Sequence, residues 1–270
     1  MQVGFIGLGN MGSGMVKNLL SNDFKVLGFD VDSEKLDELK SSRLQASNIT
    51  KVAKECEVVV LCLPNPDVSR SVIEELLAEN NTITTIIETS TLTPEIVTEF
   101  ANKLHAESKQ FLSSPMIGGK NHATNGTIEF LVEGSSEVFE ANKALFESMG
   151  KSRFMGSIPS ATLAKLSFNL SRYANLAVGV ETHRLLESYN ANIPAIYEFM
   201  SEQSLDNFGQ VWQEDLEEMM TSNIAFKPSK VPKKDLTLIS LMTKDQDLDN
   251  GLVEAIKKTY LSMNNTDDEA

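Results

Sequence analysis

A chain of 270 residues has room for one large domain or two ordinary ones, and its composition, 41% apolar and 23% charged, is typical of a globular protein. Its formal net charge of −14 argues against binding nucleic acid and gives no attraction to an anionic membrane surface. The longest apolar run, Val58 to Leu63, is too short to cross a bilayer. Cys56 and Cys62 form neither a disulfide framework nor a metal-ligand spacing, and no secretory leader precedes the first apolar segment, so we expect a cytoplasmic protein without a metal site.

The first predicted strand, Gln2–Ile6, is a short apolar run that leads directly into a glycine-rich turn and then into a helical pattern of apolar residues. In such a turn Gly7 permits the tight bend, Gly9 lets a pyrophosphate approach the backbone, and Gly12 lets the helix pack closely on the strand. The free N–H groups at the helix N-terminus favour phosphate. The alternative is a purely structural turn. The sequence predicts a dinucleotide site formed by Gly7, Leu8, Gly9, Asn10, Met11 and Gly12.

The second predicted strand, Lys25–Phe29, ends at an acid that indicates the type of dinucleotide. Asp30 follows Gly12 by 18 residues, close to the ~20 expected for the carboxylate that holds the adenosine ribose hydroxyls. Because a carboxylate there would repel a 2′-phosphate, NAD is favoured and NADP is the alternative cofactor. In the other interpretation, Asp30 or Asp32 only caps the helix that begins near Ser33.

Strand and helix patterns then alternate, which predicts a doubly wound parallel sheet with its ligand crevice beyond the carboxyl ends of the strands. The strand Glu57–Leu63 ends abruptly at Pro64, and either Thr91 or Thr93 caps a helix that runs to Leu104. The other segments of this alternation are a helical pattern containing Leu36, Leu39 and Leu44, the segment Ile49–Lys54, the helix Val68–Leu77, the strand Ile83–Glu88, and a strand near Phe111.

The pattern changes beyond residue 157. Ser160–Ser188 contains no proline and only one glycine, which predicts a single helix roughly 40 Å long. Only helix and loop follow it, and the polar tail Asn264–Ala270 is expected to be disordered. We therefore expect a dinucleotide-binding domain over residues 1–157 and an all-α substrate and oligomerisation domain over residues 158–270.

Several short motifs span most of the chain in a fixed order: Phe5–Leu19, Leu63-Pro64, Ser90-Thr91 with Pro94, Gly118-Gly119, Gly126-Thr127, Lys165 with Asn169, and Lys234-Asp235-Leu236. This series resembles the β-hydroxyacid dehydrogenase family, which includes 3-hydroxyisobutyrate and 6-phosphogluconate dehydrogenases. The first motif departs from the family only at Val16, where a small residue is usual. The resemblance implies a Rossmann-type doubly wound sheet, then a long helix and a smaller all-α domain.

For the cofactor, the resemblance implies that Leu63, Pro64 and Thr91 border it and that Lys234 lies beside its nicotinamide end. The implied reaction transfers a hydride between NAD and a small β-hydroxy acid, or the matching semialdehyde or keto acid.

For the substrate, the resemblance implies that the loop of Ile117, Gly118 and Gly119 binds the carboxylate, that Lys165 is the catalytic lysine, and that Asn169 orients the substrate. The residues support this independently: two successive glycine N–H groups can bind an anion, although they can also form only a turn. Lys165 and Asn169 lie four residues apart and so share one helix face. A lysine whose pKa is lowered toward ~7–8 can take or give the hydroxyl proton. The alternative for Lys165 is a solvated surface lysine.

Two further positions depart from the family. Ile117 stands where a serine hydroxyl usually contacts the carboxylate, which should weaken binding by about 1.5–3 kcal/mol unless Lys120 or His122 compensates. Phe168 stands where many relatives have Asn or His, which argues against a polar or phosphorylated substrate.

Two alternative functions follow: a dinucleotide-binding sensor or scaffold without turnover, motivated by Ile117, and an imine reductase on the same fold. The expected partners are the small-molecule substrate and a second copy of the chain, as a homodimer or homotetramer. The apolar residues expected to supply either a partner face or the core of the helical domain are Leu176, Val178, Val180, Phe199 and Met200.

Overall fold

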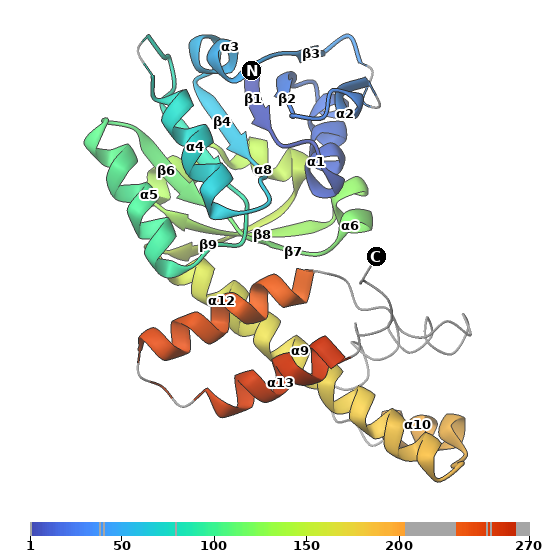
Figure 1. The fold of residues 1–270 in the computed structure, drawn as a ribbon. Coiled ribbons are helices and arrows are strands. Elements are labelled where there is room, and N and C mark those ends of the chain that lie inside the picture. The colour runs from blue at the N-terminus through green and yellow to red at the C-terminus, as the bar shows by residue number, and fades with distance from the viewer. Residues whose placement is uncertain are drawn as a thin grey trace. The chain divides into compact units, whose positions relative to one another are not determined.

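The computed structural model of the chain describes residues 2–37, 39, 41–78, 80–202, 231–246, 248 and 250–262 (Figure 1). The chain divides into two compact units, Met1–Lys165 and Leu166–Ala270. This division lies inside the long helix α9 (Ser160–Ser188). The domain boundary expected between residues 157 and 158 stays a prediction, and the tail Asn264–Ala270 lies outside the described residues.

The described strands of the first unit form one nine-stranded sheet in the order β3-β2-β1-β4-β5-β6-β8-β7, with β9 paired to β8. Their bounds are β1 Gln2–Ile6, β2 Lys25–Phe29, β3 Leu44–Ala46, β4 Val58–Leu61, β5 Thr85–Glu88, β6 Gln110–Ser113, β7 Met116–Ile117, β8 Ile128–Gly134 and β9 Gly150–Gly156. The six strands β1 to β6 are parallel, as the predicted doubly wound sheet requires.

The sheet departs from the prediction at two places. Strand β8 runs antiparallel to β6 and β7, because the short connections here include no crossover helix of the length that a parallel return needs. The spacing of leucines predicts a helix at Leu44, but this residue belongs to β3, where it pairs with Val26 of β2. Tertiary pairing with the sheet outweighs the local helical spacing here.

Helices cover both faces of this sheet, and the alternation of side chains along the strands decides which face each residue joins. Val58 and Val60 pack toward one cluster, and Val59 and Leu61 pack toward the other. The first cluster includes residues of α1 (Asn10–Ser21), α6 (Lys120–Thr124), α7 (Ser136–Ala141) and α8 (Lys143–Met149). The second includes residues of α3 (Ile49–Glu55), α4 (Pro66–Leu76) and α5 (Pro94–Ala106). The short helix α2 (Glu34–Asp37) has no buried residue.

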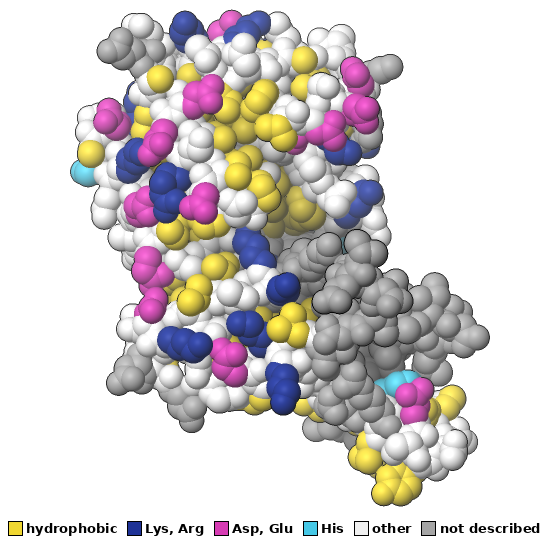
Figure 2. Space-filling view, viewed as in Figure 1, with side chains coloured by type: hydrophobic (Ala, Val, Ile, Leu, Met, Phe, Trp, Pro, Cys, Tyr) yellow, Lys and Arg dark blue, Asp and Glu magenta, His cyan; other side chains and the backbone are white. Residues whose placement is uncertain are grey.

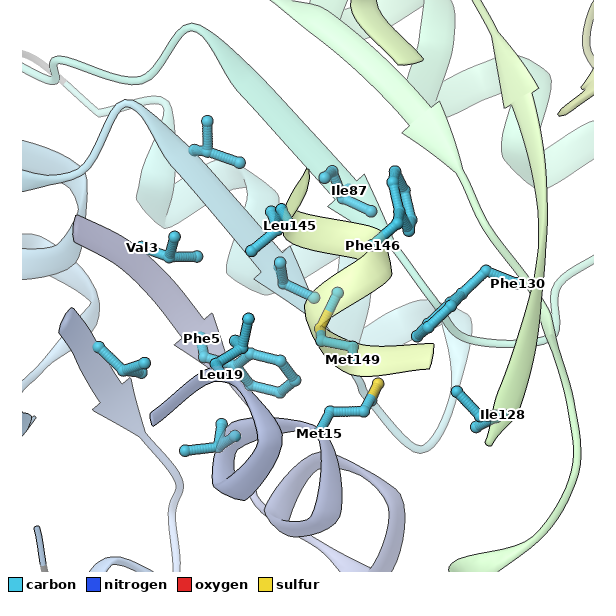
Figure 3. Packing of buried hydrophobic residues seen from close by; sticks show 14 of the residues in the cluster. Val3, Phe5, Met15, Leu19, Ile87, Ile128, Phe130, Leu145, Phe146 and Met149 are labelled. Atoms are coloured by element: carbon cyan, nitrogen blue, oxygen red, sulfur yellow. The ribbon is translucent and has the colours of Figure 1, made fainter. Parts of the chain in front are cut away.

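The first cluster holds the start of α1 in place (Figure 3). Met15 and Leu19 of α1 and Phe5 of β1 are fully buried. On the same face, Phe130 of β8 meets Phe146 of α8 edge-on, with ring centroids 5.5 Å apart. Burial of this apolar surface stabilises the strand–turn–helix unit that begins the chain.

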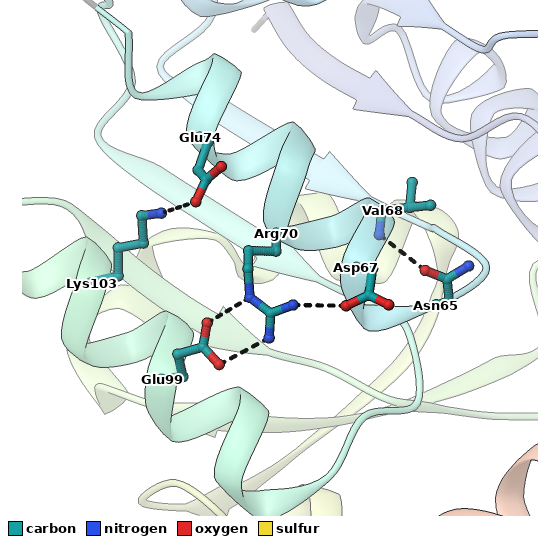
Figure 4. A network of polar contacts seen from close by, with 7 residues as sticks. All are labelled: Asn65, Asp67, Val68, Arg70, Glu74, Glu99 and Lys103. Atoms are coloured by element: carbon teal, nitrogen blue, oxygen red, sulfur yellow. Dashed lines mark hydrogen bonds and ion pairs between the residues drawn. The ribbon is translucent and has the colours of Figure 1, made fainter.

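On the other face, α4 and α5 are joined at the surface by a charged network (Figure 4). Arg70 of α4 makes two hydrogen bonds to the Glu99 carboxylate and one to Asp67, and Lys103 pairs with Glu74. The Arg70 hydrogen bond lowers the pKa of Glu99. These exposed pairs link α4 to α5 at the surface, while the buried face of α4, which begins after Leu63 and Pro64, holds the helix on the sheet.

In the second unit all described regular structure is helical: the remainder of α9, α10 (Ile193–Glu202), α12 (Val231–Asp245) and α13 (Gly251–Ser262). Helix α9 has the bounds predicted from the sequence. Tyr173 of α9, Leu236 of α12 and Tyr260 of α13 form its main apolar cluster, together with Ala177 and Ile256.

Charged side chains of both signs are interspersed over the first unit on the face drawn in Figure 2. None of the helices that the structure describes combines the length and the apolar character needed to cross a membrane.

Candidate functional site

The glycine-rich turn between β1 and α1 has the geometry that its sequence predicts. Gly7 has a φ of +97°, and a side chain there would also collide with the carbonyl oxygen of Cys62. A side chain at Gly12 would collide with the carbonyl oxygen of Gly7, so helix and turn approach more closely than any other residue allows. The N–H of Gly7 donates to the carbonyl of Phe29 (2.9 Å), which ties the turn to β2.

Gly9 is different, because it faces open space. A Cβ added to Gly9 would meet no atom within 4 Å. Gly9 is the N-cap of α1, and no side chain caps that helix. Asn10 and Met11 begin the helix, so the turn offers uncapped backbone N–H groups beside an exposed, open position. This arrangement fits the pyrophosphate of a dinucleotide.

The acid at the end of β2 holds the turn. One carboxylate oxygen of Asp30 accepts the backbone N–H of Leu8 (2.6 Å), and the other accepts the N–H of Asp32 (2.9 Å). Asp32 in turn accepts the N–H of Glu34, the first residue of α2 (3.1 Å). The sequence left open whether Asp30 or Asp32 caps that helix, and the structure shows that Asp32 makes the contact. The Asp30 carboxylate has lone pairs beyond the two backbone bonds.

The segment after β4 is fixed by a serine from the next strand end. The Ser90 hydroxyl accepts the N–H of Leu63 and donates to its carbonyl (2.9 Å each). The N–H of Ser90 donates to the buried carboxylate of Glu88 (2.9 Å). Leu63 and Pro64 are therefore held against the segment that contains Thr91. Of the two capping threonines considered, Thr93 accepts the N–H of Ile96 and begins α5.

The paired glycines lie just after β7, both exposed. A Cβ on Gly119 would meet no atom within 4 Å, and its N–H donates to Nδ1 of His122 (3.3 Å). Ile117 is the last residue of β7 and is half-buried. The Asn18 amide of α1 donates to the carbonyl of Ala123 (2.7 Å), which ties this loop to the helix of the glycine-rich turn.

Lys165 and Asn169 lie one turn apart on α9, and Asn169 is 3% exposed. The Asn169 amide donates to the buried carboxylate of Asp235 on α12 (2.7 Å), and the Tyr173 hydroxyl donates to the same oxygen (3.3 Å). Burial, and secondly the Asp235 charge, raise the pKa of Tyr173. Because an ionised carboxylate only accepts hydrogen bonds, Asp235 fixes which side of the Asn169 amide points toward it.

Lys234, the preceding residue of α12, is half-buried. Asp235 belongs to the Lys234-Asp235-Leu236 motif that the sequence analysis singled out, but the prediction gave a role only to the lysine. Ser90 was signalled in the same way, next to Thr91. Among the residues that the structure describes, no group of three or more His, Cys, Asp and Glu side chains is arranged to hold a metal ion.

A sheet whose strands β1 to β6 are parallel in this order, an uncapped glycine turn between β1 and α1, and an acid at the end of β2 together define a Rossmann-type dinucleotide-binding protein. Residues 2–157 match the family model for the NAD-binding domain of 6-phosphogluconate dehydrogenase. The chain belongs to the β-hydroxyacid dehydrogenase family.

Curated relatives agree with this family. The chain is 31% identical over 205 residues to a mitochondrial 3-hydroxyisobutyrate dehydrogenase of Drosophila melanogaster, covering 70% of this chain and 63% of the relative. It is 30% identical over 176 residues to the enzyme of the same name from Mus musculus, covering 62% of this chain and 52% of the relative. The matched region thus spans less than two thirds of these relatives.

Solved structures share the fold over almost the whole chain. The 3-hydroxyisobutyrate dehydrogenase of Mycobacterium tuberculosis, solved with L-serine, superposes with a TM-score of 0.85 at 22% identity and covers 97% of this chain and 92% of its own. An imine reductase of Streptomyces aurantiacus superposes with a TM-score of 0.69 at 18% identity, covering 97% of this chain and 94% of its own.

Proposed function

We propose that the protein is an NAD-dependent dehydrogenase or reductase that acts on a small β-hydroxy acid or the matching semialdehyde or keto acid. One observation carries this proposal beyond family membership: a buried asparagine, its amide oriented by a buried carboxylate, lies one helical turn after a lysine. An oriented amide and an amine on one helix face are the groups that a reaction at a hydroxyl needs.

When bound, the nicotinamide supplies the hydride acceptor or donor. Lys165 takes the hydroxyl proton during oxidation and returns it during reduction, a contribution of about 10²- to 10⁴-fold. Asn169 turns one N–H toward Asp235, which leaves its carbonyl Oδ1 and second N–H to orient the substrate oxygen. In this proposal Lys234 lies beside the nicotinamide end of the cofactor.

The substrate carboxylate binds the N–H groups of Gly118 and Gly119 in this proposal. Ile117 contributes no hydroxyl, and Lys120 or His122 would supply the missing donor. Nδ1 of His122 accepts the N–H of Gly119, so in this proposal the substrate carboxylate displaces the ring from that N–H. The exposed apolar ring of Phe168, next to Asn169, favours a substrate without a phosphate or further polar groups.

For the cofactor we propose NAD, bound by the glycine-rich turn and Asp30 and bordered by Leu63, Pro64 and Thr91. Asp30 and Asp32 flank the exposed Val31, and in this proposal their carboxylates would repel the 2′-phosphate of NADP. NADP remains the alternative.

The test follows NADH formation with a panel of small β-hydroxy acids and NADH consumption with the matching semialdehydes. We expect turnover with NAD that falls by at least about 10²-fold in Lys165→Ala. Lys151→Ala, which removes an exposed lysine from β9, is the matched control and should turn over like the unmodified protein. Full turnover of a folded Lys165→Ala protein would refute the role of the lysine.

Ile117 motivates the second candidate, a dinucleotide-binding sensor or scaffold. NADH binding without turnover on any member of the panel would favour it.

An imine reductase is the less favoured third candidate, since the resembling imine reductases generally lack the lysine. It would be indicated by oxidation of NADH with imines or amine–carbonyl mixtures only.

We also propose a homodimer or homotetramer formed through the helical unit. Val178 and Phe199 are 52% and 60% exposed, and Met200 is half-buried. Leu176, in contrast, packs into the unit's own apolar cluster. The side chain of Val180 lies outside the described part of the structure. Analytical ultracentrifugation of Phe199→Ser would test this face.

The cytoplasmic location stays a prediction, to be tested by cell fractionation.

A further inference from the structure

Glu133 of β8 is a fully buried carboxylate, and its hydrogen bonds to the described part of the chain all go to the first turn of α9. One oxygen accepts the backbone N–H groups of Ala161 (2.6 Å) and Thr162 (3.2 Å). The other accepts the Thr162 hydroxyl (2.6 Å). Ala161 and Thr162 are themselves buried, so no water replaces these bonds.

These contacts supply the hydrogen-bond acceptors that the first backbone N–H groups of α9 need. The N–H of Ser160 donates to the carbonyl of Ser157 (2.9 Å), and that of Leu163 donates to the carbonyl of Pro159 (3.0 Å). The two N–H groups between them have Glu133 as their acceptor. A carboxylate also matches the positive end of the helix dipole. The start of α9 is thereby fixed to the sheet by a side chain from another element.

The same strand fixes the loop proposed to bind the substrate carboxylate. Phe130 of β8 pairs with Met116 of β7, and the N–H of Leu131 donates to the carbonyl of Pro115 (2.9 Å). The Gly118-Gly119 loop follows β7 directly. Strand β8 therefore holds the carboxylate loop through its backbone and the start of α9 through Glu133.

Lys165 lies four residues after Ala161 and three after Thr162, on the same side of the helix as the anchored turn. We infer that Glu133 is a positioning residue for catalysis, which sets the place of Lys165 relative to the loop that holds the substrate carboxylate. This inference rests on the proposed function. It is not a cofactor-binding role, because the glycine-rich turn, Asp30 and Leu63 are held by other contacts.

The test compares Glu133→Gln with Glu129→Gln, a matched control on the same strand whose carboxylate pairs with the exposed Arg153. In Glu133→Gln one neutral carbonyl oxygen replaces the carboxylate as acceptor of the two N–H groups, and the NH₂ group turns to the Thr162 hydroxyl, which must reverse its bond. The negative charge at the N-terminus of α9 is lost, so the first turn of the helix is held less firmly. We expect kcat to fall about tenfold or more, with the affinity for NADH unchanged and a larger primary deuterium isotope effect on kcat. The control should match the unmodified protein. All assays are run well below each variant's thermal midpoint.

An unchanged kcat and isotope effect in Glu133→Gln, with only a lower thermal midpoint, would show that Glu133 is structural and would overturn the inference. Should Glu133→Gln fail to fold, Thr162→Val decides: it removes only the hydroxyl donor and should lower kcat in the same direction, whereas an unchanged kcat would overturn the inference. Lys165→Ala is measured in parallel. If that variant turns over fully, the role proposed for Lys165 fails, whereas no turnover of the unmodified protein with any member of the panel would refute the proposed dehydrogenase. If Lys165→Ala is inactive while Glu133→Gln is unaffected, only the role of Glu133 fails.

Discussion

Gly9 and Gly12 belong to one motif, yet a methyl group at these two positions has opposite consequences. At Gly12 it would strike the backbone of Gly7, and backbone cannot rotate away as a side chain can. At Gly9 it would enter open space, with a φ of −63° that any residue adopts. Gly12 is therefore required by the fold, whereas the fold does not require Gly9, and we propose that the dinucleotide does.

We predict that Gly12→Ala lowers the free energy of unfolding by about 1–3 kcal/mol through overpacking. Gly9→Ala should unfold like the unmodified protein but bind NADH at least about tenfold more weakly, because its methyl group occupies the place of the pyrophosphate. Chemical denaturation and NADH fluorescence titration measure the two effects. Unchanged NADH affinity in Gly9→Ala would place the pyrophosphate elsewhere.

At the scale of elements, α9 and α12 are joined by one buried carboxylate. Removing it in Asp235→Ala leaves the Asn169 amide and the Tyr173 hydroxyl without this acceptor, at a cost of about 1–3 kcal/mol for each group. We predict a lower unfolding free energy together with a lower kcat, since the Asn169 amide loses its fixed orientation. Asp245→Ala, at the exposed end of α12, is the control and should change stability by less than about 0.5 kcal/mol. A destabilised protein with an unchanged kcat would separate Asp235 from the reaction.

Periodicity predicted the elements that have a strong local signal, such as α9. The 18-residue spacing between Gly12 and Asp30 singled out Asp30, which the structure places beside the turn. Periodicity did not predict β3, which has only three residues and exists because Leu44 finds a partner in β2. Nor could periodicity predict the role of Glu133. Nothing in the sequence of β8 indicates that this carboxylate is buried or that it accepts hydrogen bonds from the first turn of α9. Such contacts depend on tertiary packing.

At the scale of the whole molecule, the first compact unit contains the glycine-rich turn and Asp30 of the predicted dinucleotide site, and the second contains Lys234. We predict that NADH raises the unfolding temperature of the first unit and that NADPH raises it less at equal concentration. A ligand at 100 times its dissociation constant stabilises by about 2.7 kcal/mol. Differential scanning calorimetry with each cofactor makes the measurement, and Asp30→Ser should reduce the difference. A larger effect of NADPH would show that Asp30 does not select NAD.

The bonds from Leu8 to Asp30 and from Gly7 to Phe29 close the glycine-rich turn within the protein's own structure. Had the turn been loose, a dinucleotide would have to order it, and part of the binding free energy would be lost as conformational entropy. With the turn already formed, we expect the association rate for NADH to be limited by diffusion and orientation instead of by a slow loop rearrangement. Stopped-flow traces should then show a single phase whose rate rises linearly with NADH concentration.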